Sequence, residues 1–227
     1  MARVRNAGSA AGQNGVMRPR TTDVEITIAL RWAVVGAASL AAGVLLGVVL
    51  AVVVDPIDLD RWWNGFVGGV VPSLQPLSLV MNAVGGGWIA TYAVPLSGAL
   101  LLVLARRPWS GLFFLAATAL SAGVVQVLKS IFGRVRPEDM LVISDHGSFP
   151  SGHTANAATL VVVAVVLFPR LWVALVGATW VLLMAFSRTQ VHAHWFTDTV
   201  GGTLVGAGVA LLVAAAFVLP ILRERDR

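Results

Sequence analysis

The feature that most constrains this chain is a series of apolar runs, each close to the length needed to cross a membrane. A transmembrane helix takes roughly 20 predominantly apolar residues. Because 57% of the residues are hydrophobic and only 12% are charged, the chain has too few polar side chains to cover a water-soluble domain. The sequence therefore predicts an all-α integral membrane protein, a six-transmembrane-helix bundle. The six predicted runs are residues 29–54, 88–105, 109–128, 151–168, 171–186 and 197–222.

Two segments fall outside these runs. Residues 1–25 are rich in Ala, Gly and Arg and lack apolar periodicity, so we expect a disordered tail. Residues 55–87 are apolar but are interrupted by prolines and glycines, and they contain the pair Trp62 and Trp63. Since tryptophan is enriched at the membrane–water interface, we expect this segment to be interfacial and extracytoplasmic. Residues 26–227 then form a single membrane domain.

The arginines predict the orientation of the bundle. Cytoplasmic loops carry an excess of Lys and Arg, and an inside N-terminus puts ten cations in the cytoplasm against five outside. Both termini are therefore expected in the cytoplasm of a plasma-membrane protein. The cations are scattered over short loops and tails, so the net charge of +5 does not predict a nucleic-acid partner. The ten inside are Arg3, Arg5, Arg18, Arg20, Arg106, Arg107, Arg170, Arg223, Arg225 and Arg227, and the five outside are Arg61, Lys129, Arg134, Arg136 and Arg188.

Three short polar segments separate the last four runs: residues 129–137, 150–153 and 185–200. Ionisable groups next to apolar spans are costly and usually functional. Between the second and third segments the chain crosses the membrane twice. All three segments are therefore predicted to emerge on the same face, which the arginine distribution makes the extracytoplasmic one.

The cations of these segments indicate a phosphate site. Lys129, Arg136 and Arg188 would repel one another on one small face unless an anion lay among them, and guanidinium groups bind phosphate oxygens bidentately. Ser151 is a favoured N-cap residue, and Gly152 lets a ligand approach the backbone. The first N–H groups of the helix that starts there would bind an anion as well.

The same segments carry groups suited to bond chemistry. On a helix that begins near His194, this residue and Asp198 share a face, so Asp198 would accept the Nδ1–H of the imidazole and leave Nε2 free for attack. His153, from another helix, would serve as general acid. The remaining polar residues are expected to be inert or to face solvent or headgroups: His146, His192, Arg61 and Arg134.

Together these residues form the pattern Lys-x6-Arg-Pro, Pro-Ser-Gly-His and Ser-Arg-x5-His-x3-Asp, spanning residues 129–198. In this pattern and spacing the chain resembles the type-2 phosphatidic acid phosphatase superfamily, and its apolar runs resemble the integral-membrane branch. The matching residues are Lys129, Arg136, Pro137, Pro150, Ser151, Gly152, His153, Ser187, Arg188, His194 and Asp198.

The resemblance implies a mechanism. His194 would attack phosphorus to form a phosphohistidine, Asp198 would orient it, and His153 would protonate the leaving group. It implies no cofactor and no metal, because the cations neutralise the charge of the transition state. The implied phosphate ligands are Lys129, Arg136, Arg188, Ser151 and the amide of Gly152.

The polar segments directly adjoin apolar runs, which places the site near the depth of lipid headgroups. The expected substrate is therefore a membrane phospholipid or related lipid phosphate, either a polyisoprenyl pyrophosphate or a phosphatidate-type lipid. Two alternatives remain open. The chain would be a phosphotransferase if an acceptor lipid or sugar took the phosphoryl group, or a non-catalytic lipid-phosphate binding or transport protein. Oligomeric state does not follow from the sequence.

Overall fold

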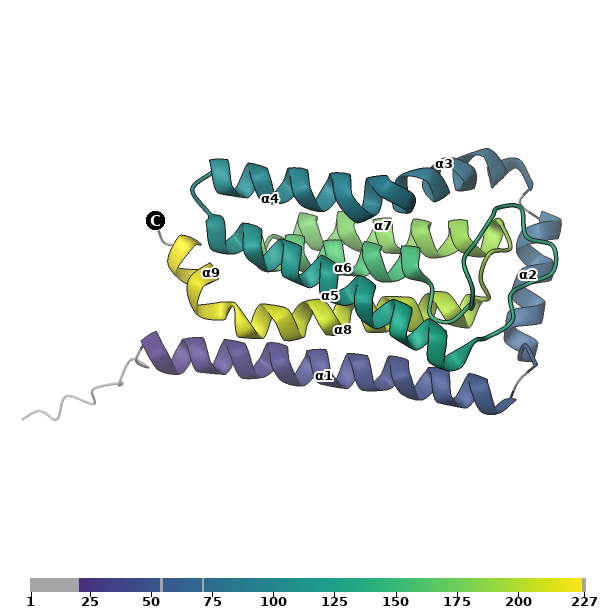
Figure 1. The fold of residues 1–227 in the computed structure, drawn as a ribbon, viewed down its shortest axis with the longest axis horizontal. Helices are drawn as coiled ribbons and strands as arrows, with labels where there is room; N and C mark the ends of the chain where they lie inside the picture. Colours follow the sequence, from purple (N-terminus) through teal and green to yellow (C-terminus); the bar gives the residue numbers. More distant parts are fainter. Residues whose placement is uncertain (1–20, 54, 71, 226–227) are drawn as a thin grey trace, which may run out of the picture.

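In the computed structural model, described over residues 21–53, 55–70 and 72–225, all regular elements within these ranges are helical (Figure 1). They are α1 (Thr21–Val53), α2 (Asp58–Val70), η1 (Pro72–Leu74), α3 (Gln75–Gly85), η2 (Ile89–Ala93), α4 (Val94–Leu104), α5 (Pro108–Phe132), α6 (Gly152–Leu167), α7 (Leu171–Gln190), α8 (Phe196–Ala216) and α9 (Val218–Arg225).

Each predicted apolar run forms a helix, although the boundaries differ. Among the described residues, four helices are long and apolar enough to cross a membrane, namely α1, α5, α7 and α8, or up to five if the bent pair Asp58–Gly69 and Pro72–Gly85 forms one span. The stretches Ile89–Leu104 and Gly152–Leu167 are apolar but shorter. The chain is thus a multi-pass integral membrane protein. Helix α1 already includes residues 21–25, which the sequence assigned to the tail, and the rest of that tail lies outside the described residues.

Small residues let α8 sit at the centre of the bundle, packed against α1 and α6. Ser39 of α1 donates a hydrogen bond to the backbone oxygen of Leu204, 2.8 Å away. A Cβ atom on Gly206 would lie 2.1 Å from the backbone oxygen of Ala155, so this crossing with α6 requires glycine. Backbones that approach this closely gain the dispersion contacts that hold helices together in lipid.

The predicted interfacial segment contains two helices with different directions. Helix α2 lies across one end of the bundle, whereas α3 runs along it beside α7 and is followed by η2 and α4 (Figure 1). Trp62 of α2 is 60% exposed and stacks on Phe66. An aromatic face of this kind is typical of helices at the membrane surface.

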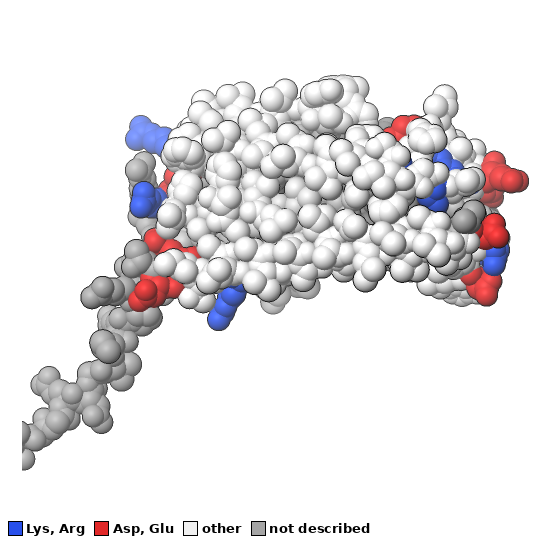
Figure 2. Space-filling model, turned by 60° about the horizontal axis from the view of Figure 1, so that its bottom comes forward, with Lys and Arg blue, Asp and Glu red and all other residues white. Residues whose placement is uncertain are grey.

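Charged side chains gather toward the two ends of the face drawn in Figure 2, and the belt between them is almost free of charge. Large apolar side chains are exposed along the helices that form the belt, as at Leu45, Leu101 and Leu182. This distribution is the one that a lipid environment favours.

The three polar segments meet at one end of the bundle, as predicted. The loop between α5 and α6 and the turn between α7 and α8 lie together there, close to α2 (Figure 1). The described part of the chain begins and ends at the opposite end, where α1 starts and α9 finishes.

Candidate active site

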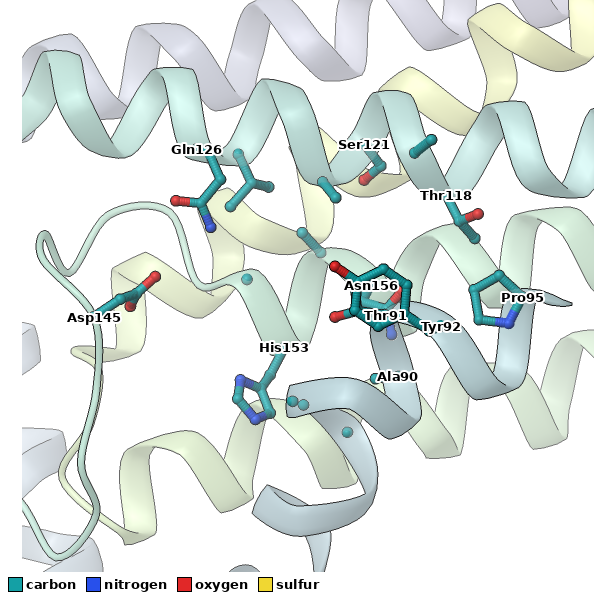
Figure 3. Close-up of a pocket in the computed structure, with 18 of the residues that line it drawn as sticks. Ala90, Thr91, Tyr92, Pro95, Thr118, Ser121, Gln126, Asp145, His153 and Asn156 are labelled. Atoms are coloured by element: carbon teal, nitrogen blue, oxygen red, sulfur yellow. The ribbon is translucent and has the colours of Figure 1, made fainter.

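A cavity of about 550 Å³ opens beside the three polar segments. His194, His153 and Arg188 line it together with Lys129 and Gly152. From there the cavity continues between α4 and α5 into the bundle, where Tyr92, Pro95 and Thr118 face it, while Asp145 and His153 lie toward its other end (Figure 3).

His194 lies in the turn that joins α7 to α8 and is only 2% exposed. Its Nδ1 atom is 2.7 Å from the backbone oxygen of Ser148. A carbonyl oxygen can only accept a hydrogen bond, so Nδ1 carries the proton and Nε2 keeps its lone pair. Nε2 accepts a hydrogen bond from Nη1 of Arg136 at 3.3 Å.

Burial lowers the pKa of His194 to about 4, because desolvation of the imidazolium outweighs the opposing charge of Asp198. The ring is consequently neutral near pH 7. A neutral ring with an unprotonated Nε2 is the form that a nucleophilic histidine requires.

The position of Asp198 differs in one respect from the sequence-based expectation. Its Oδ2 atom lies 3.7 Å from Nδ1 of His194, too far for the expected hydrogen bond. The reason is that Oδ2 accepts hydrogen bonds from the backbone N–H of Trp195, 2.9 Å away, and from the hydroxyl of Ser148. Nδ1–H donates to the Ser148 carbonyl instead, and the same tautomer results.

Two of the predicted phosphate ligands converge on one carboxylate. Nζ of Lys129 and Nη2 of Arg136 each lie 2.7 Å from Oδ1 of Asp145, which belongs to the loop between α5 and α6. Burial acts to raise the pKa of Asp145, but the hydrogen bond and the charges of these cations outweigh it and hold the pKa below its ordinary value. The carboxylate of Asp145 therefore bridges the two cations.

Arg188 is 1% exposed and reaches the cavity from α7. Its Nη1 atom donates to the side-chain oxygen of Asn82 at 2.5 Å. Among the described residues its buried Nε has no hydrogen-bond partner. A buried N–H of this kind is costly unless it finds an acceptor, so Arg188 has donor capacity left for a ligand.

The start of α6 brings two of the Pro-Ser-Gly-His residues, Gly152 and His153, to the cavity, whereas Ser151 does not line it. Nε2 of His153 lies 3.1 Å from the backbone oxygen of Asn82 and therefore carries a proton. Gly152 lines the cavity. Ser151 occupies the N-cap position but its side chain makes no capping hydrogen bond; it accepts the hydroxyl of Thr154 at 3.1 Å.

The sequence analysis missed the role of Arg134, which it expected to face solvent or headgroups. The side chain is buried, and it forms ion pairs with both Asp60 and Asp198. The only indication in the sequence that Arg134 belongs to the site was its position two residues before Arg136. Its partner Asp60 lies on a helix far away in the sequence. Asn82 and Asp145 had no sequence signal at all.

The two remaining histidines do not line the cavity. His192 has a positive φ of 53° and contacts Asn64 at 2.7 Å and Asp139 at 3.2 Å. His146 is exposed in the loop before α6. Within the described ranges, no three His, Cys, Asp or Glu side chains cluster as metal ligands.

Comparison with known proteins shows similarity to one family over about half of the chain. Residues 110–219 match the model of the PAP2 superfamily. A lipid A 1-phosphatase of Rhizobium johnstonii is 31% identical over 121 residues, which cover 48% of each chain. Phosphatidylglycerophosphatase B of Bacillus subtilis is 31% identical over 118 residues, or 48% of this chain and 58% of the relative. The chain thus spans about half the length of the curated relatives it matches.

The fold gives a broader match. The crystal structure of a transmembrane PAP2-type phosphatidylglycerolphosphate phosphatase from Bacillus subtilis superimposes with a TM-score of 0.64 and 25% identity. The superposition covers 77% of this chain and 94% of the other. Residues 110–219 thus match the PAP2 superfamily, and the fold is similar to that of a transmembrane member of this superfamily.

Proposed function

We propose that this protein is a membrane lipid phosphatase that hydrolyses a lipid phosphate through a phosphohistidine at His194. The observation that best supports the proposal is the length of the cavity and its extension from the polar residues into the bundle. It is lined by Lys129 at the catalytic end and by Leu115 at the other. Fourteen residues of α5 separate the two, which corresponds to about 21 Å along the helix. A cavity this long and largely apolar inside the bundle fits a lipid tail, whereas a soluble phosphate ester has no use for it.

In the proposed first step, Nε2 of His194 attacks phosphorus, and the P–O bond to the lipid breaks. Arg136 moves from Nε2 onto a phosphate oxygen, and Arg188 and Lys129 bind the others, which offsets the charge of the transition state. The Ser148 carbonyl keeps the proton on Nδ1 throughout. Since three cations surround the phosphate, we expect activity without a divalent metal ion.

We assign His153 as the acid for the leaving oxygen, because its protonated Nε2 lines the cavity. The negative charge of the bound phosphate favours the imidazolium form, which becomes neutral when it gives this proton to the lipid alcohol. In the second step the neutral ring accepts a proton from the water that attacks the phosphohistidine. Phosphate then leaves and His194 is regenerated.

The substrate class follows from the same geometry and from the relatives. The relatives are named for three different lipid phosphates, as a lipid A 1-phosphatase, a phosphatidylglycerophosphatase and an undecaprenyl-diphosphatase. A phosphate at headgroup depth with its tail in the cavity fits this chain, so a phosphatidate-type phosphomonoester is the proposed substrate. A polyisoprenyl pyrophosphate presents its terminal phosphate in the same way.

Orientation and span count are part of the proposal. We propose that α1, α4 with η2, α5, α6, α7 and α8 each cross the membrane, with α2 at the surface. The arginine distribution supports an orientation with both termini in the cytoplasm and the site on the extracytoplasmic face. A protease-accessible tag after Arg227 tests this, since it should be cleaved only when the cytoplasmic side is exposed.

The functional test is phosphate release by the purified protein in proteoliposomes over a panel of lipid phosphates, in excess chelator. We expect release from at least one lipid with no acceptor present, and none from His194→Ala. The exposed His146 provides the matched control, because His146→Ala should retain turnover. Release that depends on an added acceptor would indicate a phosphotransferase, and turnover by His194→Ala would contradict the proposal.

A further inference from the structure

A chain of buried charges connects α2 to the histidine that we assign as the nucleophile. Arg134, which follows α5 directly, lies between two carboxylates that are both fully buried. Its Nη2 atom is 2.7 Å from Oδ2 of Asp60, and its Nη1 atom is 2.5 Å from Oδ1 of Asp198. Nη1 also donates to the hydroxyl of Thr197 at 2.8 Å.

Asp60 holds the first turn of α8 as well. Its Oδ1 atom accepts the backbone N–H of Thr197 at 2.9 Å, and its Oδ2 atom accepts the Thr197 hydroxyl at 2.7 Å. Three residues further along α2, Trp63 donates to Thr189 at 2.9 Å. Helix α2 is therefore attached to both sides of the turn that carries His194.

Two residues, Asp198 and Ser148, link Arg134 to His194 through hydrogen bonds and an ion pair. Asp198, fixed by Arg134, accepts the hydroxyl of Ser148, and the carbonyl of the same Ser148 accepts Nδ1–H of His194. Removing one partner from a buried charge group leaves the others uncompensated. A planar guanidinium can hold two carboxylates at fixed angles, which a lysine ammonium cannot do.

We propose that Arg134 and Asp60 are positioning residues for His194, acting through Asp198 and Ser148. The proposal rests on the proposed function of His194, and it assigns to α2 the task of holding the catalytic turn. Neither residue lines the cavity, and their charged groups are held by each other, Thr197 and Asp198, so we expect both to act through these partners and not on the substrate.

The charges predict opposite effects for the two residues on the protonation of His194. The charged groups that act directly on its ring are Asp198 from α8, Arg136 from the loop and Arg188 from α7. Lys129 and His153 face the same cavity from α5 and α6. Arg134→Gln removes the positive charge that pairs with Asp198. The midpoint of the His194 titration should therefore move to higher pH. Asp60→Asn leaves Arg134 with Asp198 alone, so the titration should stay or move to lower pH.

The test combines kinetics with a readout that does not need turnover. Proteins labelled with ¹⁵N-histidine are titrated by NMR, with the His194 signal assigned by its loss in His194→Gln, and kcat and KM are measured on a lipid phosphate. We expect kcat of Arg134→Gln and Asp60→Asn to fall about 100-fold, as misplacement of a reacting group does, while KM changes little. Arg134→Lys should be intermediate.

The matched control on the same helix is Asp58, which is exposed and, within the described part of the chain, forms an ion pair with Arg61 alone. Asp58→Asn should match the wild type in both readouts. The proposal is overturned if both variants keep wild-type kcat. It is equally overturned if both shift the His194 titration toward that of a free histidine, because a loosened fold predicts the same shift for each. Failure of the wild type to release phosphate would contradict the proposed function alone, since the titration still reports the positioning.

Discussion

The Nδ1 atom of His194 donates to the backbone carbonyl of Ser148 at 2.7 Å, whereas the carboxylate of Asp198 stands 3.7 Å away. The tautomer of His194 is thus set by the backbone of the loop that precedes α6. Asp198 contributes charge and holds Ser148 and Trp195 in place.

This arrangement predicts a moderate effect for Asp198→Asn. In a triad whose carboxylate sets the tautomer, the same substitution costs roughly 10⁴-fold in kcat. Here the Ser148 carbonyl still fixes the tautomer, so we expect a loss of only about 10- to 100-fold. Phosphate release in proteoliposomes measures it. A loss as complete as that of His194→Ala would show that the carboxylate, and not the carbonyl, orients the ring.

The protonation of His194 gives a second prediction. Its pKa of about 4 lies below that of an ordinary histidine because the ring is buried. In the folded protein the ring should stay neutral as the pH falls from 7 to about 4 and take up a proton only below that. Since the unfolded chain binds this proton first, stability should fall over the same interval. A ¹⁵N-histidine titration with a midpoint near 6.5 would contradict the burial of the ring.

Asp145 provides a third prediction, because its carboxylate forms ion pairs with both Lys129 and Arg136. A phosphate that binds these cations must displace it. We expect Asp145→Asn to bind vanadate, a mimic of the phosphoryl transition state, roughly tenfold more tightly, about 1.4 kcal/mol. Inhibition of phosphate release measures the affinity. Glu138→Gln, an exposed change in the same loop, is the control, and weaker binding by Asp145→Asn would show that Asp145 supports the anion site.

The apolar part of the cavity gives a fourth prediction. Ala119 lines it ten residues before Lys129, and a larger side chain there would narrow the space for a lipid tail. We expect Ala119→Phe to lower kcat/KM for a long-chain lipid phosphate about tenfold or more, the cost of misplacing a substrate, and to affect a short soluble phosphate ester far less. Leu120→Phe, on the exposed face of the same helix, should change neither. Equal losses on both substrates would show that the lipid tail does not occupy this cavity.

Sequence reasoning found the apolar helices and the residues of the three polar segments, because both depend on local order. Ser151, His153 and His194 lie at helix ends. Because two predicted membrane crossings separate the first two from the third, the sequence already predicts that all three lie on one face. Arg134 and Asp60 could not be found in this way. Their contact joins a loop after α5 to a helix across the bundle end, and a surface arginine has the same local sequence as a buried one.

The acceptor of His194 Nδ1 was mispredicted for a related reason. Helical spacing places Asp198 one turn from His194, but it does not show that the carboxylate is already used by Trp195, Ser148 and Arg134. Competition among several donors for one carboxylate is decided by tertiary structure. The same holds for Asn82, whose backbone and side chain contact His153 and Arg188 from α3.

The central claim is that His194 forms a covalent bond to phosphorus. The most direct measurement is a rapid quench of the purified protein, in proteoliposomes, with a lipid phosphate radiolabelled on phosphorus, followed by peptide mapping. The account predicts label on the peptide that contains His194, stable in base and labile in acid, and absent from His194→Ala but present in His146→Ala. Full turnover with no label on this peptide, or label retained by His194→Ala, would contradict it.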